Sequence, residues 1–252
     1  MTDGFLDVHN LGMTFHDSKT QLEVLRDISF SLGQEEFLCV LGPSGSGKST
    51  LLRLIAGLLK PTNGGINFAD CDCAPRVGLV FQHANLMPWR TVRQNIALPL
   101  EIQQVSPVKI EARVDEMIRL VGLEEFSHSW PSELSGGMAQ RVAIARAFIQ
   151  EPDLLLLDEP FGALDALTRE RMGAELLNIW QGQRIPVVMV THSISEALLL
   201  SDRVLVFTPR PGQLAQDMPV PFSRPRQEEL RYTAAFQQME RELRGNLRIS
   251  IS

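Results

Sequence analysis

The chain has 252 residues, of which 44% are hydrophobic, so it can bury a sizeable core as one large domain or as a domain with an inserted lobe. Its formal net charge of -6 argues against a nucleic-acid-binding protein, which needs a basic face for the phosphate backbone. The N-terminus shows no secretory signal, and the apolar windows 51–59 and 154–157 are far shorter than the roughly 20 apolar residues of a membrane span. We therefore expect a cytoplasmic chain that reaches a membrane only through a partner.

The first third of the chain predicts an antiparallel β lobe followed by a strand and a helix. Residues 8–32 alternate apolar and polar positions around polar turns, which is typical of short half-buried strands. The continuous apolar run 37–41 indicates a fully buried strand. An apolar helical face covers 51–59, and we expect Lys60-Pro61 and a turn at 63–65 to end that helix.

The remaining chain alternates predicted helices and strands. Apolar residues four, seven and eleven positions after Ile110 predict a helix that begins at Pro107, behind a Ser106 cap, and ends at Gly122. Strands that alternate with helices imply a largely parallel sheet covered on both faces. We expect a further helix over 136–150, strands over 154–158, 187–191 and 204–207, and a solvated docking helix over 228–244, whose charges alternate in sign.

A phosphate-binding motif lies between the predicted strand 37–41 and the helix after it. The segment GPSGSGKST matches G-x-x-x-x-G-K-[ST] in the context that this motif requires. Its glycines let backbone N–H groups surround a phosphate, and the helix N-terminus favours negative charge there. Lys48 can reach the β- and γ-phosphates, and the Ser49 hydroxyl can bind Mg²⁺. The nucleotide-binding residues are Gly42, Pro43, Ser44, Gly45, Ser46, Gly47, Lys48, Ser49 and Thr50.

The phosphate motif alone does not distinguish kinases, GTPases and helicases. The alternative to phosphate binding is a glycine-rich turn that carries a solvated lysine. A second element narrows the choice. The apolar strand 154–157 delivers Asp158 and Glu159 at its carboxyl end, where α/β sheets bind ligands. Asp158 suits Mg²⁺, and Glu159 can polarise a water molecule near the γ-phosphate. Either acid alone could be a solvated strand terminus.

From Leu6 to about Gly212 the sequence resembles the ATP-binding subunits of ABC transporters. The order and spacing of several short motifs agree with that family. They are the phosphate loop, Gln82, Leu134-Ser135-Gly136-Gly137-Met138, Asp158-Glu159, Ala163-Leu164-Asp165 and Thr191-His192. Four longer segments are similar to the nitrate, sulfonate and taurine importer subfamily, although they do not name the cargo: NLMPW (85–89), LSGGMAQR (134–141), EPFGALDALTR (159–169) and PRPG (209–212).

The resemblance implies the α/β fold of a P-loop NTPase. A RecA-like core with an antiparallel β subdomain would comprise residues 1–87 and 151–215. A helical subdomain, residues 88–150, would be inserted in it, and residues 216–252 would form a C-terminal extension whose role the sequence does not indicate.

The resemblance also implies roles for single residues. Gln82 would contact Mg²⁺ or the attacking water and sense the membrane partner, while His192 would hold the γ-phosphate. Mg²⁺ would be bound by Ser49, Gln82 and Asp158. Ser135, Gly136 and Gly137 would meet the γ-phosphate of ATP bound to a second copy of the chain, with Asp165 at that interface.

The sequence departs from the family pattern at several positions. Phe15 stands where an aromatic residue, often tyrosine, stacks on adenine, and simple core packing is the alternative. Met138 replaces a glutamine and Ser193 an aspartate. The three cysteines predict reduced thiols, and a surface turn explains Cys71 and Cys73 better than a metal site does. Trp89 either packs in the helical lobe or faces a membrane partner.

These observations predict an ATPase that uses ATP and Mg²⁺ to drive a membrane importer. The expected partners are a second copy of the chain, integral-membrane permease subunits and an extracytoplasmic solute-binding protein, at the cytoplasmic face of the inner membrane. An exporter or lipid-handling ATPase would share all of this chemistry. A soluble ABC ATPase of DNA repair or translation would carry coiled-coil insertions or duplicated domains, and a non-catalytic module would not need the set Lys48, Asp158, Glu159 and His192.

Overall fold

The computed structural model describes residues 4–17, 20–69, 75–162 and 164–249. Their contacts divide the chain into two units, the first made of Met1–Pro75 with Pro186–Ser252 and the second of Arg76–Ile185. The α/β fold class predicted from the sequence is confirmed. The subdomain boundaries at residues 87, 150 and 215 stay a prediction.

The first unit begins with an antiparallel sheet in the order β2-β1-β4. Strands β1 (Gly4–Asp17) and β2 (Thr20–Gly33) have 14 residues each, so the prediction of several short strands was wrong. The register between β1 and β2 shifts at several points, so β1 continues through polar residues as one long strand. Asn10, which lies at the shift between Val8 and Leu11, has a φ of 46°. Ile28, Phe30 and Leu32 are buried, as their alternation predicted.

The turn predicted at residues 63–65 was also wrong, because these residues begin β4 (Asn63–Phe68). Gly65 pairs with His9 and Asn63 with Gly12 in the antiparallel register of β1 and β4. Gly64 has a φ of 72°, and a Cβ atom there would lie 2.3 Å from the carbonyl oxygen of His9. Glycine is needed where the two backbones approach so closely. The glycines that suggested a turn therefore belong to a strand.

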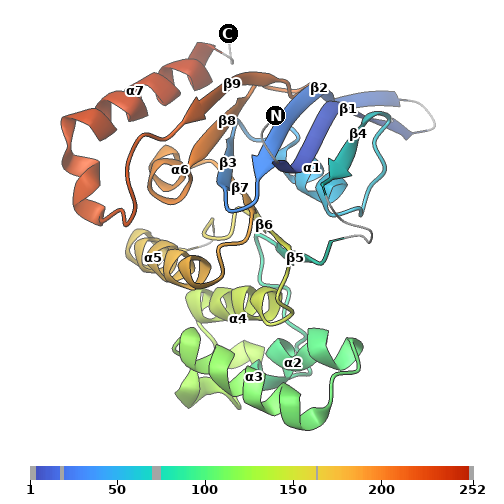
Figure 1. The fold of residues 1–252 in the computed structure, drawn as a ribbon, viewed down its shortest axis with the longest axis vertical. Helices are drawn as coiled ribbons and strands as arrows, with labels where there is room; N and C mark the ends of the chain where they lie inside the picture. The colour runs from blue at the N-terminus through green and yellow to red at the C-terminus, as the bar shows by residue number, and fades with distance from the viewer. Residues whose placement is uncertain (1–3, 18–19, 70–74, 163, 250–252) are drawn as a thin grey trace. The chain divides into compact units, whose positions relative to one another are not determined.

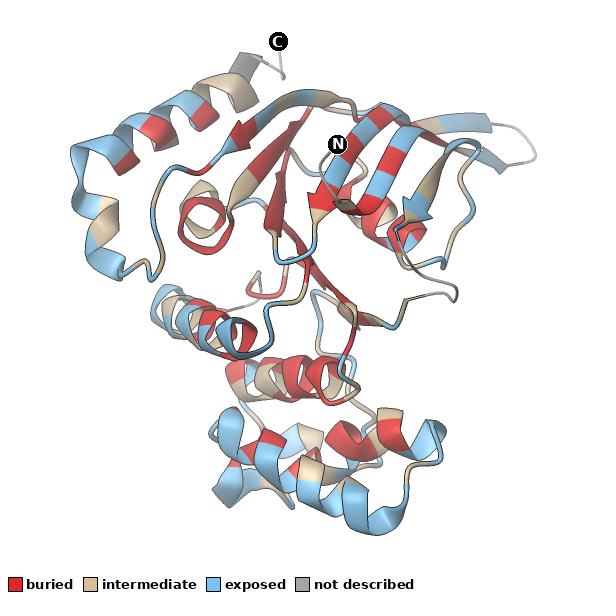
Figure 2. Cartoon of the chain, viewed as in Figure 1, coloured by how far each residue is buried: buried red, intermediate tan, exposed pale blue. Residues whose placement is uncertain are grey.

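The other sheet of the first unit has the order β7-β3-β8-β9. Strands β3 (Phe37–Leu41) and β7 (Val187–Thr191) are parallel and buried throughout, as Figure 2 shows, and β8 (Arg203–Phe207) is parallel to β3 on its other side. The edge strand β9 (Leu214–Pro219) is antiparallel to β8. Buried parallel strands need helices on both faces. Helix α1 (Lys48–Ile55) packs on β7 and α6 (Ile194–Leu200) on β3, on opposite sides of the sheet (Figure 1).

Helix α1 is shifted from its predicted range of 51–59. It begins at Lys48, directly after the glycine-rich loop, and ends at Ile55. The chain then turns through Gly57, whose φ is 70°, a left-handed conformation that suits glycine at a helix C-terminus.

The C-terminal helix differs most from its prediction. A 3-10 helix (Glu228–Tyr232) precedes α7 (Ala234–Ile249), and the Thr233 hydroxyl between them accepts a hydrogen bond from the Phe236 N–H. The predicted helix over 228–244 therefore starts too early. Its solvated character was also wrong, because Phe236, Met239 and Leu243 are buried and α7 packs on α6 and β8. These residues share one face at helical spacing, which the alternating charges concealed.

The second unit contains two parallel strands, β5 (Val77–Val80) and β6 (Leu154–Asp158). Four helices accompany them: α2 (Val92–Ile102), α3 (Pro107–Leu120), α4 (Gly136–Phe148) and α5 (Ala166–Gln183). Two 3-10 helices, Glu124–Phe126 and Pro131–Glu133, connect α3 to α4. The helices expected over 107–122 and 136–150 are confirmed.

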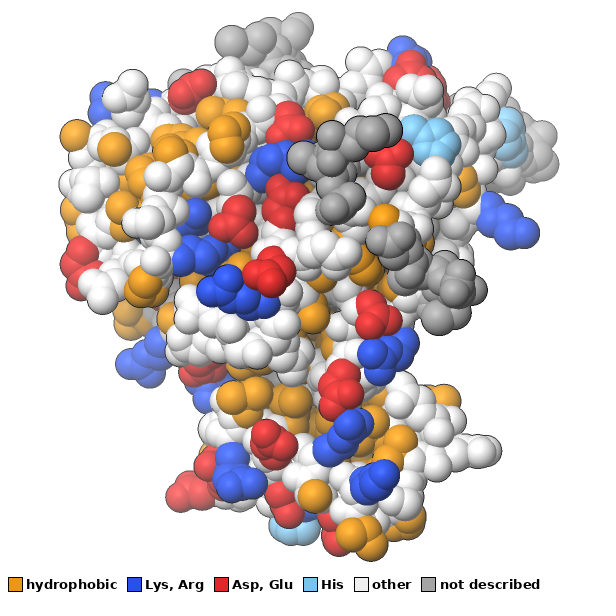
Figure 3. Space-filling model, viewed as in Figure 1, with side chains coloured by type: hydrophobic (Ala, Val, Ile, Leu, Met, Phe, Trp, Pro, Cys, Tyr) orange, Lys and Arg blue, Asp and Glu red, His pale blue; other side chains and the backbone are white. Residues whose placement is uncertain are grey.

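Apolar contacts hold the second unit. Val114, Met117 and Val121 are buried as predicted, and α4 packs on α2, β5 and α5. Ion pairs such as Arg113 with Glu151 lie at its surface, and Figure 3 shows acidic and basic side chains interspersed over one face. Surface pairs contribute little stability each.

No helix within the described ranges is long and apolar enough to cross a membrane. Cys39 is buried in β3, and burial raises the pKa of its thiol. The predictions for Cys71 and Cys73 lie outside the described residues.

Candidate functional site

The phosphate motif forms the connection between β3 and α1, as predicted. Gly47 takes the cap position of α1 with a φ of 91°, and no side-chain hydrogen bond caps the helix there. The first backbone N–H groups of a helix have no partner within it, and they carry the positive end of the helix dipole. The start of α1 therefore presents the electrostatics that an anionic group needs.

Lys48 holds its ammonium group within this loop. Its Nζ atom donates to the carbonyl oxygens of Gly42 at 2.8 Å and Pro43 at 2.9 Å, and the residue is only 5% exposed. At the loop's apex, Gly45 has a φ of 78°, and a Cβ atom placed there would have no neighbour within 4 Å. A buried cation beneath an open, glycine-lined loop fits a phosphate group, and the residues present therefore suit ATP.

Gly212 supports the loop from behind, a role that the sequence analysis missed. A Cβ atom at this position would lie 2.0 Å from the Ser46 carbonyl oxygen. The Gly212 N–H donates to the Val24 carbonyl at 2.8 Å, and its own carbonyl accepts from the Arg26 N–H at 3.0 Å. The Pro-Arg-Pro-Gly segment had indicated only a subfamily, although its last residue packs directly on the phosphate loop.

His192 follows β7 and the phosphate loop follows β3 at the same end of the sheet. Leu41 pairs with Thr191 in the parallel register of β3 and β7, so Gly42 and His192 follow at the same level. The Thr191 hydroxyl donates to Glu196 Oε2 at 2.6 Å and accepts from the Ser193 N–H at 3.0 Å. Ser193 caps α6 by accepting from the Glu196 N–H at 3.3 Å. Ser193 therefore takes the N-cap role at the start of α6.

Phe15 lies on β1 with 40% of the residue exposed. The alternative of core packing was therefore wrong, and the ring surface is accessible to a planar ligand.

Gln82 and Glu159 are brought together in the second unit. They follow β5 and β6, whose parallel register pairs Val80 with Leu157. The Gln82 Nε2 atom lies 3.5 Å from Glu159 Oε2. Glu159 has a φ of 45°, a left-handed conformation that is costly for a residue other than glycine and that concentrates at functional sites. Asp158, the last residue of β6, is 9% exposed.

The segment LSGGM (134–138) leads into α4, which begins at Gly136. Ser135 caps the helix, its hydroxyl accepting from the Met138 N–H at 3.2 Å. Gly137 is buried, and a Cβ atom there would lie 2.8 Å from Thr168 Cγ2 on α5. Ser135 and Gly136 are exposed at the helix N-terminus, an arrangement that suits an anion from outside the chain.

Asp165 caps α5. Its carboxylate accepts from the Thr168 N–H at 3.0 Å, and hydrogen bonding by Thr168 lowers the pKa of Asp165. The carboxylate is exposed and charged at neutral pH.

The predicted site residues are divided between the units. Phe15, residues 42–50 and His192 belong to the first unit, and Gln82, residues 135–137, Asp158, Glu159 and Asp165 to the second. Among the residues that the structure describes, no group of three or more His, Cys, Asp or Glu side chains could hold a metal by itself. The Ser49 hydroxyl in the first unit and the Asp158 carboxylate in the second are each an oxygen donor of the kind that Mg²⁺ prefers.

Asn95 organises the loop that follows Gln82. It is fully buried, accepts from the Met87 N–H at 2.8 Å and donates to the carbonyls of Met87, Arg90 and Thr91. These bonds hold the loop while Trp89 remains 69% exposed, so this tryptophan does not pack in the helical lobe. Only contacts in the folded chain identify Asn95, because a lone asparagine within a helical pattern gives no signal in the sequence.

Comparison with known proteins identifies the family. Residues 25–162, more than half of the chain, match the family described as ABC transporter. The chain belongs to the ABC transporter family. It is 46% identical over 233 residues to the nitrate import ATP-binding protein NrtD of Synechococcus elongatus, covering 90% of this chain and 85% of that protein. It is also 46% identical over 219 residues to the taurine import ATP-binding protein TauB of Pelagibacter ubique, covering 85% and 82%.

Solved structures of another ATP-binding cassette, MJ0796, are similar as well. The dimeric post-hydrolysis state of the ATP-binding cassette MJ0796 bound to ADP and Pi superposes with a TM-score of 0.76 at 31% identity, covering 86% of this chain and all of that one. The fold is therefore that of an ATP-binding cassette, as the sequence predicted, and the ABC chain is an ATP-hydrolysing enzyme.

Proposed function

We propose that this ABC chain is the ATP-hydrolysing subunit of a membrane importer for a small solute such as nitrate, a sulfonate or taurine. The observation that carries the proposal is the buried Lys48 ammonium beneath the glycine loop at the start of α1. That arrangement binds a phosphate chain, and the nitrate and taurine import ATP-binding proteins are the relatives that motivate the solute class.

Each part of the site has a proposed task. Lys48 and the backbone N–H groups of the loop bind the phosphates, and Phe15 stacks on adenine. Asp158 and Ser49 would hold a Mg²⁺ ion, which would supply positive charge to neutralise the phosphates. Glu159, oriented by Gln82, accepts a proton from the attacking water, and His192 contacts the γ-phosphate.

The enzyme works as a dimer of two copies in this proposal. The dimeric state of the solved cassettes supports it. The N-terminus of α4, residues 135–137, of which Ser135 and Gly136 are exposed, would complete the site of the second copy with its N–H groups, and Asp165 would lie beside it.

We further propose that the chain associates with the cytoplasmic face of the inner membrane through permease subunits. The loop held by Asn95 supplies a contact in the form of the exposed Trp89, a residue type common at the energetic centres of interfaces. An extracytoplasmic solute-binding protein would deliver the solute. The subdivision into residues 1–87 with 151–215, 88–150 and 216–252 is part of the same proposal.

The test compares Lys48→Ala with Lys60→Ala, a matched loss of an exposed lysine. Lys48→Ala should abolish ATP hydrolysis and greatly weaken Mg-ATP binding, because the phosphate charge loses its cationic partner. Lys60→Ala should hydrolyse ATP like the unmodified chain. Normal turnover in Lys48→Ala would refute the site. Reconstitution with the copurifying permease, and uptake of labelled nitrate or taurine, then tests the import role.

A further inference from the structure

The C-terminal segment encloses the end of α6, the helix that directly follows His192. Three segments meet there: the last turn of α6, the start of β3 at Phe37, and the chain from Val220 to Arg226. The final carbonyl groups of a helix have no partners within it. In this protein, arginine side chains from the C-terminal segment donate hydrogen bonds to carbonyl groups of the last turn of α6.

Arg226 binds two of these carbonyls and the carbonyl of Ser201, the residue that follows the helix. Its Nη1 atom donates to Leu198 O at 2.9 Å, to Leu199 O at 3.5 Å and to Ser201 O. Its Nε atom donates to the Phe222 carbonyl at 2.9 Å, so the side chain also ties its own segment together. The side chain is 1% exposed. A buried cation at a helix C-terminus satisfies both the carbonyl groups and the negative end of the helix dipole.

Arg224 completes the arrangement and links it to β3. Its Nη2 atom donates to Leu200 O, and its Nε atom donates to Asp202 Oδ1 at 2.8 Å. The other oxygen of Asp202 accepts from the Phe37 N–H at 3.0 Å. Phe37 is the first residue of the strand that leads into the phosphate loop, so Asp202 links Arg224 to β3. Arg226 donates its hydrogen bonds to carbonyls at the end of α6, and its Nη2 atom lies 3.8 Å from Asp202 Oδ1, beyond hydrogen-bond distance.

Helix α6 is short enough for its two ends to depend on each other. It has 7 residues, a length that is not stable in isolation, so its position is set by tertiary contacts. Its first turn carries the Thr191, Ser193 and Glu196 bonds on either side of His192. A displacement of the last turn would therefore be transmitted to the imidazole.

From this geometry we propose that Arg226 is a positioning residue for ATP hydrolysis: by holding the last turn of α6, it fixes the helix whose first turn orients His192. The inference rests on the proposed function, in which His192 contacts the γ-phosphate. It also gives the C-terminal extension a task in the enzyme's chemistry.

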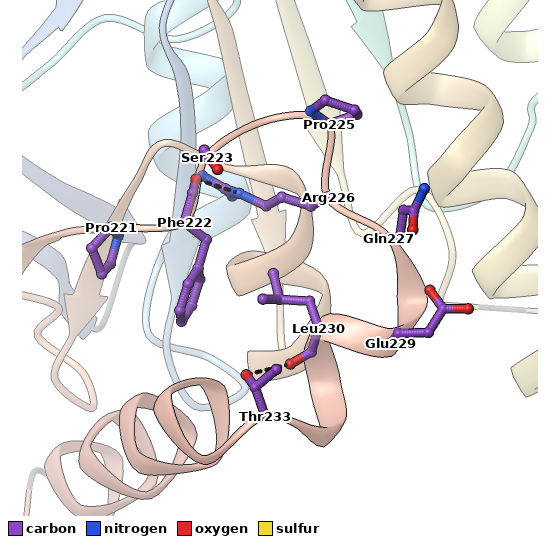
Figure 4. A pocket seen from close by; sticks show the side chains of 9 residues that line it. All are labelled: Pro221, Phe222, Ser223, Pro225, Arg226, Gln227, Glu229, Leu230 and Thr233. Carbon is purple, nitrogen blue, oxygen red and sulfur yellow. Dashed lines mark hydrogen bonds between the residues drawn. The ribbon is translucent and has the colours of Figure 1, made fainter.

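An open pocket of about 460 Å³ borders this arginine, which helps the choice of variants. Figure 4 shows Arg226 turned back toward Phe222, with Leu230 and Thr233 on the other side of the pocket. Methionine, of similar length, can replace the arginine beside this space without forcing its neighbours apart. Arg226→Met removes every donor and the charge, while Arg226→Lys keeps the charge and part of the donor capacity.

The experiment measures kcat, KM and ATP affinity of the full chain with Arg226→Met, Arg226→Lys, His192→Ala and the double variant His192→Ala/Arg226→Met. Arg244→Met is the matched control, because Arg244 is an exposed arginine of the same extension that pairs with Glu240 within α7. We expect Arg226→Met to lower kcat by about 10- to 100-fold, the effect of misplacing one reacting group by roughly 1 Å. ATP affinity should change little, since Lys48 follows β3. The lysine variant should recover part of the loss, and the control should match the unmodified chain.

The double variant separates positioning from general damage. If Arg226 acts through His192, adding Arg226→Met to His192→Ala should lower single-turnover hydrolysis no further. An equal additional loss in that background, or an unchanged kcat in folded Arg226→Met, would overturn the inference. Should the methionine variant fail to fold, the same cycle with Arg226→Lys decides. If His192→Ala alone left kcat unchanged, the inference would fall together with the role of His192, whereas the Lys48 test reports separately on the ATP site.

Discussion

Gly212 leaves no room for a side chain beside Ser46: a Cβ atom there would lie 2.0 Å from the Ser46 carbonyl oxygen. Two backbone hydrogen bonds, with Val24 at 2.8 Å and Arg26 at 3.0 Å, prevent Gly212 from moving away. Gly212 lies 166 residues after Ser46 in the chain. It nevertheless sets the distance between the phosphate loop and β2.

Gly212→Ala should weaken ATP binding. The added methyl group must displace the loop, and overpacking of this kind costs about 1–3 kcal/mol, or roughly 5- to 150-fold in affinity if the strain falls on the ATP-binding conformation. Titration with a fluorescent ATP analogue measures it. Gly245→Ala is the control, because a Cβ atom there meets nothing within 4 Å. Unchanged affinity in Gly212→Ala would show that the loop accommodates the methyl group freely.

The sequence predicted the parts of the fold that depend on neighbouring residues. The apolar runs at 37–41, 154–158 and 187–191 became buried strands because a strand covered on both faces needs apolar residues at every position. The phosphate loop was predictable for the same local reason, since its glycines, lysine and helix start are contiguous. Ser106 was the cap that the sequence predicted, and it takes the N-cap position of α3, although its side chain makes no cap hydrogen bond.

Contacts between distant segments were not predictable. Gly64 looked like a turn residue, but its lack of a side chain serves the approach of β4 to β1. Alternating charges in the last helix indicated solvent exposure, whereas Phe236 and Leu243 dock it on its unit. Arg226 carried no signal either, because its partners are backbone carbonyls of α6, which any sequence supplies.

Gly137→Ala should destabilise the second unit. A Cβ atom at Gly137 would lie 2.8 Å from Thr168 Cγ2, whereas one at Gly136 would lie 3.8 Å from Leu164, an ordinary contact. We expect Gly137→Ala to cost about 1–3 kcal/mol of unfolding free energy and Gly136→Ala to cost less.

Thr168→Ser removes the clashing methyl group and keeps the backbone bond to Asp165, so the double variant Gly137→Ala/Thr168→Ser should regain stability in thermal denaturation. If Gly137 also approaches a phosphate, ATPase activity should stay low in that stable double variant. Recovery of both properties together would leave Gly137 with a packing role alone.

Asp153 should make stability depend on acidity. The Arg76 side chain, by hydrogen bonding, lowers the pKa of Asp153, and the Arg76 N–H donates to the same carboxylate at 2.8 Å. Because the folded-state pKa lies below the unfolded value, the stabilisation is present above the ordinary Asp pKa of about 3.9. It is lost as the pH falls through the lowered folded value.

Asp153→Asn should therefore lower the melting temperature near pH 7 by an amount corresponding to roughly 1 kcal/mol or less, since the pair is partly exposed. The difference from the unmodified chain should shrink as the solution is acidified below about pH 4. Glu111→Gln, at an exposed position of α3, is the charge-matched control. A difference that persisted at the lowest pH would assign the effect to amide packing instead of charge.

Glu159→Gln should separate ATP binding from hydrolysis. The amide keeps the size of the side chain and can still pair with Gln82, which lies 3.5 Å from it, but it cannot accept a proton from water. General-base assistance contributes about 10²- to 10⁴-fold in rate, or roughly 3–5 kcal/mol of barrier. Binding contacts from Lys48 and Ser49 are unchanged, so ATP affinity should stay near that of the unmodified chain.

Slow hydrolysis has a structural consequence in the proposed dimer. If each ATP lies between the phosphate loop of one copy and residues 135–137 of the other, Glu159→Gln should accumulate the ATP-closed dimer in sedimentation or light scattering with Mg-ATP. Glu125→Gln, at an exposed position of a 3-10 helix, should remain as monomeric as the unmodified chain. A Glu159→Gln chain that binds ATP tightly yet stays monomeric, both alone and with its permease, would contradict the shared site. Near-normal hydrolysis by Glu159→Gln in the permease complex would show that Glu159 is not the catalytic base. The variant has lost this carboxylate and has gained no other base.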